Sequence, residues 1–117
     1  MSVTWQAMTF DCADAASLAG FWSQVLEQPV GEGATPEQAS IASGQHGPHW
    51  YFIQVPEGKT VKNRVHPDLT APDLPSEVER LTRLGATAQA EHEEGGFRWV
   101  TLRDPEGNEF DVLAESS

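Results

Sequence analysis

Basic residues are scarce in this sequence of 117 residues, where seven lysines and arginines stand against 18 aspartates and glutamates. The formal net charge is −11, and every lysine or arginine lies at or after Lys59. Nucleic acids and anionic membranes are bound through basic patches that neutralise phosphate groups. We therefore expect no nucleic-acid partner and no membrane partner.

Cysteine and long apolar runs are also missing. Cys12 is the single cysteine, so an internal disulfide is excluded. The first residues lack the basic stretch and following apolar run of a signal peptide, and no apolar run approaches the roughly 20 residues of a membrane span. These absences predict a cytoplasmic protein, because the cytoplasm keeps thiols reduced.

Aromatic residues are nevertheless well represented, with four tryptophans and five phenylalanines in a chain that is 38% hydrophobic. A disordered chain of low hydrophobicity would not carry them in regular apolar runs. The length lies within the usual range of one domain. We expect a single folded domain over residues 1–117.

The first half predicts a strand, a helix and further strands. Residues 3–12 alternate, so that Phe10 and Cys12 share one face while Thr9 and Asp11 share the other. Asp14 is placed to cap a helix, whose apolar stripe has helical spacing and consists of Leu18, Phe21, Trp22, Val25 and Leu26. Residues 28–48, rich in glycine and proline, predict two weak strands, and the apolar residues 49–55 predict a central strand.

The second half repeats this order. Residues 64–71 predict a strand, Asp73 a helix cap and Gly85 the end of that helix. Three strands follow at 87–93, 97–103 and 109–115, with turns at Gly95-Gly96 and at residues 104–108.

The two halves align at a constant offset of 59 residues, which sets Ala7 opposite His66 and Asp14 opposite Asp73. This indicates an internal duplication and an α+β fold. Two readings compete with it: any two strand-to-helix junctions can look alike over so few residues, and the same element order is found in a ferredoxin-like single sheet.

Three segments carry a resemblance to a known family. They are residues 10–22 (FDCADAASLAGFW), residues 63–86 with NRVHPDL at their start, and the closing DPEGNEFD of residues 104–111. Together they resemble the vicinal oxygen chelate (VOC) superfamily, the group of glyoxalase-like domains, bleomycin resistance proteins and extradiol dioxygenases. The resemblance implies two tandem βαβββ modules, about 1–60 and 61–117, whose curled mixed sheet forms a cavity. It also implies a homodimer, for which Trp5 or Trp22 would be anchors.

Metal-using members of that superfamily place ligands on the first and last strands of each module. The matching positions are Ala7 and Phe52 in the first module, with Gln54 as the alternative to Phe52, and His66 and Asp111 in the second. Only His66 and Asp111 offer ligand chemistry. The resemblance therefore implies a catalytic and metal-binding half site for Zn, Fe, Mn or Ni, with a metal-free acid/base pair as the alternative.

Strand periodicity predicts which other side chains line that cavity. The expected pocket residues are Thr9, Asp11, Trp50, Phe52, Gln54, Asp68 and Glu109, joined by Thr70 and Leu113. Acids and aromatics in this arrangement favour a small molecule with an apolar body and a cationic or hydroxyl-bearing edge.

Two functions remain open at this point. The first is a lyase, isomerase or dioxygenase of glyoxalase type, in which a bound metal acts as a Lewis acid. The second is a carrier that sequesters a small molecule or drug without chemistry, as bleomycin resistance proteins do. Ala7 and Phe52, which cannot act as metal ligands, favour the second.

Overall fold

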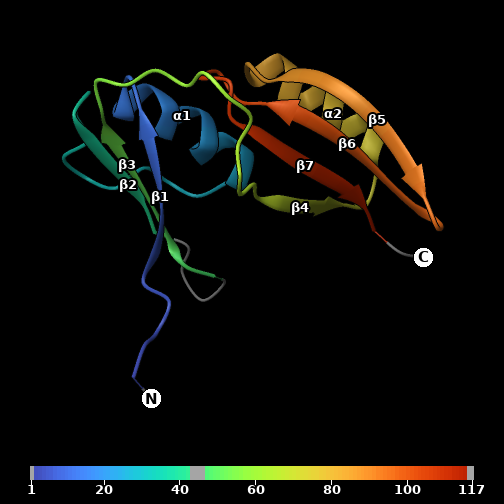
Figure 1. The fold of residues 1–117 in the computed structure, drawn as a ribbon, viewed down its shortest axis with the longest axis horizontal. Coiled ribbons are helices and arrows are strands. Elements are labelled where there is room, and N and C mark those ends of the chain that lie inside the picture. The colour runs from blue at the N-terminus through green and yellow to red at the C-terminus, as the bar shows by residue number, and fades with distance from the viewer. Residues whose placement is uncertain (1, 43–46, 116–117) are drawn as a thin grey trace. The chain divides into compact units, whose positions relative to one another are not determined.

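The computed structural model of the chain describes residues 2–42 and 47–115. The chain divides into two compact units, residues 1–58 (unit 1) and 59–117 (unit 2). Each described unit contains one helix and its own mixed sheet (Figure 1). Two separate sheets confirm the α+β class and contradict the ferredoxin-like alternative, which needs a single sheet. Neither helix of the described residues is long and apolar enough to cross a membrane.

Unit 1 has the order strand, helix, strand, strand. Its elements are β1 (Ala7–Cys12), α1 (Ala15–Leu26), β2 (Gln38–Ile41) and β3 (His49–Gln54). The sheet order is β1-β3-β2, with β3 parallel to β1 and antiparallel to β2. The predicted central position of the strand from residue 49 is thus confirmed.

Two strand predictions in unit 1 are wrong in extent. The first strand begins at Ala7 rather than at residue 3, because residues 2–6 are exposed and pair with no other described strand. Of the two weak strands expected within 28–48, only β2 is formed, and Val30 contributes an isolated bridge to Ile41. Residues 43–46 lie outside the described residues.

The core of unit 1 is aromatic. Asp14 caps α1 as predicted, since its Oδ1 accepts the N–H of Ser17 at 3.0 Å. The helix then packs its apolar stripe on the sheet, where the rings of Phe10, Trp22, Trp50 and Phe52 cluster with several centroid distances between 5.1 and 5.6 Å. Trp22 is 0% exposed. The suggestion that it anchors a dimer is therefore wrong, whereas Trp5 is exposed.

Unit 2 has the predicted order of strand, helix and three strands. Its elements are β4 (Asp68–Ala71), α2 (Leu74–Leu84), β5 (Thr87–Glu94), β6 (Phe97–Arg103) and β7 (Glu109–Ala114). The sheet order is β4-β7-β6-β5, with β4 parallel to β7 and the other pairs antiparallel. The first strand of this unit is shorter than predicted and begins at Asp68 instead of Arg64.

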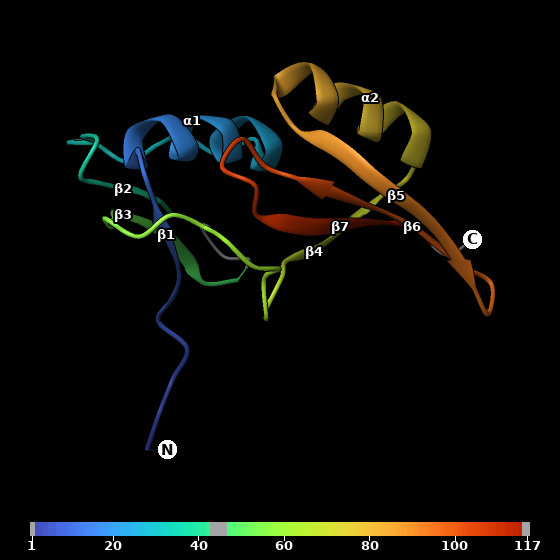
Figure 2. The same cartoon turned by 45° about the horizontal axis from the view of Figure 1, so that its top comes forward.

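Helix α2 covers one face of the unit 2 sheet, as Figure 2 shows. Asp73 caps it through the N–H of Ser76 at 3.1 Å, and Gly85 ends it with a φ of 126°, a region that favours glycine. The core beneath it is mainly aliphatic and contains Leu74, Leu81, Val100, Leu102, Phe110 and Val112. No described helix or strand of unit 2 lies on the opposite face, which we call the open face.

The turn before β7 is held by its own first residue. The buried Asp104 carboxylate accepts the backbone N–H groups of Glu106 and Asn108, both at 2.9 Å, and the Asn108 side-chain amide. Gly107 adopts a φ of 87°, as the fourth residue of such a turn often requires. The DPEGN motif thus determines where β7 starts and which of its side chains reach the open face.

Candidate functional site

The open face of unit 2 is defined by strand alternation. Phe110 and Val112 of β7 are buried in the core, so Glu109, Asp111 and Leu113 point to the opposite face. Asp111 pairs with Asp68 of β4 and with Thr101 of β6 in the sheet register. The expected placement of these residues is therefore found.

One imidazole and two carboxylates meet on this face where the edge strand β4 pairs with β7. His66 Nδ1 lies 2.9 Å from Asp68 Oδ1 and 3.8 Å from Asp111 Oδ2. His66 precedes β4 instead of lying on it, but the Pro67 carbonyl accepts the N–H of Asp111 at 3.0 Å and keeps this segment beside β7. The Thr101 hydroxyl donates to Asp111 Oδ1 at 2.6 Å, which orients that carboxylate.

These three residues have the donor set of a divalent metal site. Each offers one ligand atom, and the three atoms lie within 4.8 Å of one another. An imidazole nitrogen with two carboxylate oxygens suits Zn, Fe or Mn. The residues therefore fit such an ion. The sequence predicted His66 and Asp111 as ligands and Asp68 only as a pocket residue, so the third donor was missed.

A cavity of about 510 Å³ adjoins this group on the open face. Asp68 and Asp111 belong both to the cavity wall and to the donor group. The rest of the wall consists of Glu94, Gly95, Phe97, Trp99 and Leu113. Phe97 and Trp99 were not predicted, although period-two alternation along β6, once its pairing with Leu113 is known, places them on this face.

Glu109 was also expected in the ligand pocket. In the structure its carboxylate is bound by other residues of unit 2. Its carboxylate accepts the backbone N–H of Asn63 at 2.9 Å and lies 3.2 Å from the Lys59 ammonium. Burial raises the pKa of Glu109, but these bonds and the Lys59 charge outweigh burial and hold the pKa below its ordinary value. Glu109 is thus ionised at the edge of the site, and the Lys59 ammonium compensates its charge.

In unit 1, part of the predicted pocket lies on the wrong face. Thr9 and Asp11 are exposed on the face away from α1, as expected. Trp50 and Phe52, however, are buried against Phe10 in the helix-facing core, and Gln54 shares their face and donates to the Ala13 carbonyl at 2.9 Å. The prediction that these three share a face with Thr9 and Asp11 is therefore wrong.

The error is one residue of register. Partners on β1 and β3 are 42 residues apart, as in Ala7 and His49, whereas partners on β4 and β7 are 43 apart, as in Asp68 and Asp111. A shift by one residue moves a side chain to the other face of a sheet. The counterpart of Asp111 is consequently Tyr51 and not Phe52.

The described residues of unit 1 offer no metal-binding counterpart of the unit 2 group at the matching positions. Ala7, Thr9 and Tyr51 stand where unit 2 has His66, Asp68 and Asp111. Alanine offers no donor, and the neutral hydroxyl groups of threonine and tyrosine are weak ligands beside carboxylates.

Comparison with solved structures shows the same fold at low sequence identity. A glyoxalase/bleomycin resistance protein/dioxygenase family enzyme from Burkholderia phytofirmans PsJN matches with a TM-score of 0.76 and 17% identity, covering 93% of this chain and 96% of that one. A mutant of the fosfomycin resistance protein FosX from Listeria monocytogenes, complexed with Mn(II) and dihydroxypropylphosphonic acid, matches with a TM-score of 0.77 and 12% identity, covering 99% and 92%.

A lactoylglutathione lyase from Agrobacterium tumefaciens is a third similar structure, with a TM-score of 0.67, 15% identity and coverage of 97% and 94%. No curated protein matches the chain. The model of the Glyoxalase-like domain family matches residues 7–113. Since this match spans nearly the whole chain, the protein belongs to the Glyoxalase-like domain family and has the fold of the VOC superfamily.

Proposed function

We propose that the open face of unit 2 binds a divalent metal ion through His66, Asp68 and Asp111, together with a small organic molecule in the adjoining cavity. The observation that carries this proposal is that Asp68 and Asp111 belong to both the donor group and the cavity wall. The similar FosX structure contains Mn(II), which supports the same class of ion here.

The residues of this face have separate tasks in the proposal. A bound ion supplies Lewis acidity toward ligand oxygens, and three protein donors leave coordination positions for them. Thr101 holds Asp111 in place, while Phe97, Trp99 and Leu113 provide an apolar wall for the body of the ligand. The activity that fits is that of a lyase, isomerase or dioxygenase acting on a molecule with neighbouring oxygens.

A carrier without chemistry is the second candidate. It is favoured by unit 1, where Ala7, Thr9 and Tyr51 add no donors to the site. The two candidates differ in turnover. A panel of oxygen-bearing compounds incubated with the Mn-loaded protein separates them, because an enzyme converts at least one member of the panel and a carrier releases every one unchanged.

Metal titration tests the proposed site directly. Mn²⁺ binding is measured by calorimetry and by electron paramagnetic resonance for the wild type, His66→Ala and Asp111→Asn. The matched controls are His49→Ala and Asp11→Asn, which remove the same groups from unit 1. We expect one Mn²⁺ per chain, a loss of affinity of about tenfold or more in the unit 2 variants, and no change in the controls.

Two results would contradict the proposal. One is the absence of any stoichiometric metal in the wild type after supplementation. The other is equal binding by His66→Ala and His49→Ala, which would place the ion elsewhere.

The homodimer and the cytoplasmic location expected from the sequence stay predictions. The exposed Trp5, 72% accessible, is the tryptophan available for a subunit contact. Light scattering of the wild type and of Trp5→Ala gives the number of subunits and shows whether the Trp5 side chain stabilises their association.

A further inference from the structure

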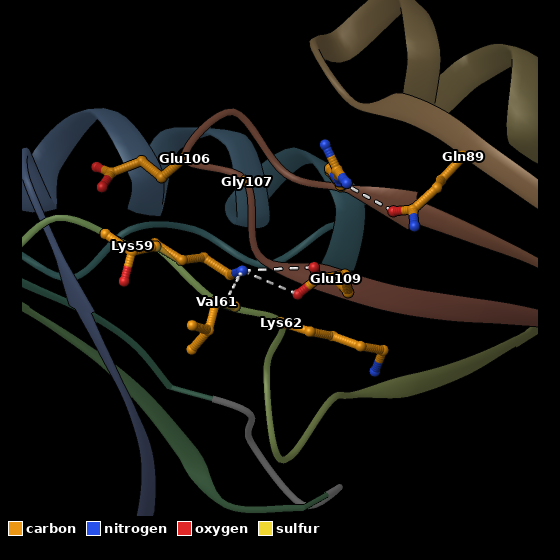
Figure 3. A pocket seen from close by; sticks show the side chains of 9 residues that line it. Lys59, Val61, Lys62, Gln89, Glu106, Gly107 and Glu109 are labelled. Atoms are coloured by element: carbon orange, nitrogen blue, oxygen red, sulfur yellow. Dashed lines mark hydrogen bonds and ion pairs between the residues drawn. The ribbon is translucent and has the colours of Figure 1, made fainter.

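A second cavity lies within unit 2, beside the turn before β7, and cations concentrate there. It has a volume of about 350 Å³ and is lined by Lys59, Thr60, Val61, Lys62, Gln89, Arg103, Glu106, Gly107 and Glu109. Three of the seven cationic side chains of this strongly acidic chain line this one cavity. Figure 3 shows Lys59 directed toward Glu109 and Lys62 on the neighbouring part of the same segment.

Part of this positive charge is not neutralised. Lys59 is committed to Glu109, at 3.2 Å, and to the Val61 carbonyl. Arg103 donates its Nε–H to the neutral Gln89 amide at 2.9 Å, which leaves its charge unpaired. The Lys62 ammonium forms no hydrogen bond or ion pair with any described residue. Two cations therefore face this cavity without a carboxylate partner.

The acidic residues of the cavity do not compensate these two cations. The Glu109 carboxylate is buried and is already satisfied by Lys59 and by the N–H of Asn63. The Glu106 carboxylate points away from the Lys59 ammonium in Figure 3. The cavity thus has a local excess of positive charge, which favours an anion.

Arg103 lies on the same face of the sheet as the candidate metal group, because Val100 and Leu102 of β6 are buried on the other face. Arg103 pairs with Glu109, and the next pair on this face joins Thr101 and Asp111. Two residues along a strand span about 7 Å. The pair of Arg103 and Glu109 therefore lies one such step from the pair of Thr101 and Asp111, a separation that a small molecule can span.

We propose that the ligand of the open face carries an anionic group, a carboxylate or a phosphoryl group, and that Lys62 and Arg103 bind this group. The inference rests on the proposed function for the claim that the face binds a small molecule. Both side chains suit the role, since the planar guanidinium of Arg103 presents further N–H donors and Lys62 adds a point charge on a flexible stem.

This reverses the charge that the sequence alone favoured. The residues first assigned to the pocket included several acids and no cation, so a cationic or hydroxyl-bearing edge was expected for the ligand. In the structure, Glu109 is neutralised, and Lys62 and Arg103 join the face from the segment before β4 and from β6.

Four probes with one aromatic ring test the charge of the ligand: phenylphosphonate, benzoate, benzamide and benzylamine. Binding is followed by NMR chemical shifts of backbone amides at constant ionic strength, for the wild type and for Lys62→Gln/Arg103→Gln. The matched control is Arg83→Gln/Arg98→Gln, which removes the same net charge from unit 2 outside this cavity. The Arg103→Lys variant keeps the charge and should keep anion binding. Retained dispersion of the amide signals in each variant shows that the variant is folded.

We expect one or both anions to shift the amides around Lys62 and Arg103 and to bind about tenfold more tightly than benzamide. The stronger of the two anions identifies the carboxylate or the phosphoryl group. The Lys62→Gln/Arg103→Gln variant should lose this preference, and the control should keep it.

The inference is overturned if benzylamine binds as tightly as the anions, or if both double variants weaken anion binding equally. A separate Mn²⁺ titration of the same variants distinguishes the two proposals. Metal binding without anion preference overturns only the inference, and anion preference without metal binding overturns only the metal site.

Discussion

Units 1 and 2 have the same element order but use their side chains differently. Helix α1 buries six residues and packs Trp22 on the rings of Phe10 and Trp50, whereas α2 buries only Leu74 and Leu81. Unit 2 in turn carries the imidazole, carboxylates and cations of the candidate sites on its open face. The comparison teaches that the first unit places its aromatic side chains in the core, whereas the second gathers polar and charged side chains on an open face.

The largest expected effect tests the core of unit 1. Trp22→Ala removes a fully buried ring that contacts Phe10, Phe21 and Trp50. We expect a loss of about 3–5 kcal/mol in the free energy of unfolding, measured by urea denaturation. The control is Trp99→Ala in unit 2, a half-exposed ring that should cost about 1 kcal/mol or less. Equal losses would contradict the difference in burial between Trp22, in the core of unit 1, and Trp99, on the open face of unit 2.

The second effect concerns the turn before β7. Asp104→Ala leaves two partly buried backbone N–H groups and the Asn108 amide without their acceptor, so we expect about 1–3 kcal/mol of destabilisation. Because the turn positions β7, Mn²⁺ affinity should fall as well. Asp104→Asn retains one acceptor and should lie between the wild type and Asp104→Ala. A fully stable Asp104→Ala protein would show that the motif does not determine the start of β7.

The third effect is a pH dependence that arises from Glu109 of unit 2. The folded pKa of Glu109 lies below its ordinary value of 4.5, so its ionisation stabilises the fold above that pH and the contribution disappears as pH falls through the folded pKa. The difference in unfolding free energy between the wild type and Glu109→Gln should therefore be greatest near neutral pH and shrink on acidification. A difference that does not vary with pH would contradict the lowered pKa.

The smallest effect on stability, and the sharpest test of the comparison, comes from rebuilding the missing donors in unit 1. Ala7→His, Thr9→Asp and Tyr51→Asp together transfer the unit 2 donors to positions of the same register. None of the three side chains is fully buried, so each change should cost about 0.5 kcal/mol or less. Mn²⁺ titration should then show a second ion bound per chain with weaker affinity. A variant with Phe52→Asp in place of Tyr51→Asp should bind no second ion.

Local signals were read correctly from the sequence. The caps at Asp14 and Asp73, the helix end at Gly85 and the turn from Asp104 all appear where their residue types predicted them, because each depends on hydrogen bonds within a few residues. The open-face positions of Asp68 and Asp111 followed from period-two alternation within single strands.

Pairings between distant segments were read less well. Phe52 was predicted as the counterpart of Asp111, although the counterpart is Tyr51. The alignment of the two halves assumed equal spacing, whereas unit 2 has one residue more between its paired strands. Trp50, Phe52 and Gln54 were placed on the wrong face for the same reason. The ion pair of Lys59 with Glu109 was not predicted, since it joins residues 50 positions apart.

The sequence by itself determined the class of fold, the repeat of strand, helix and strands, and the candidate ligands His66 and Asp111, because these follow from local periodicity and from a family motif. Only the tertiary structure decided that Asp68 completes the donor group, that Phe97 and Trp99 wall the adjoining cavity, and that Lys62 and Arg103 line a second cavity. The physical reason is that strand register depends on the length of chain between the partners, and a single residue reverses the face that a side chain occupies.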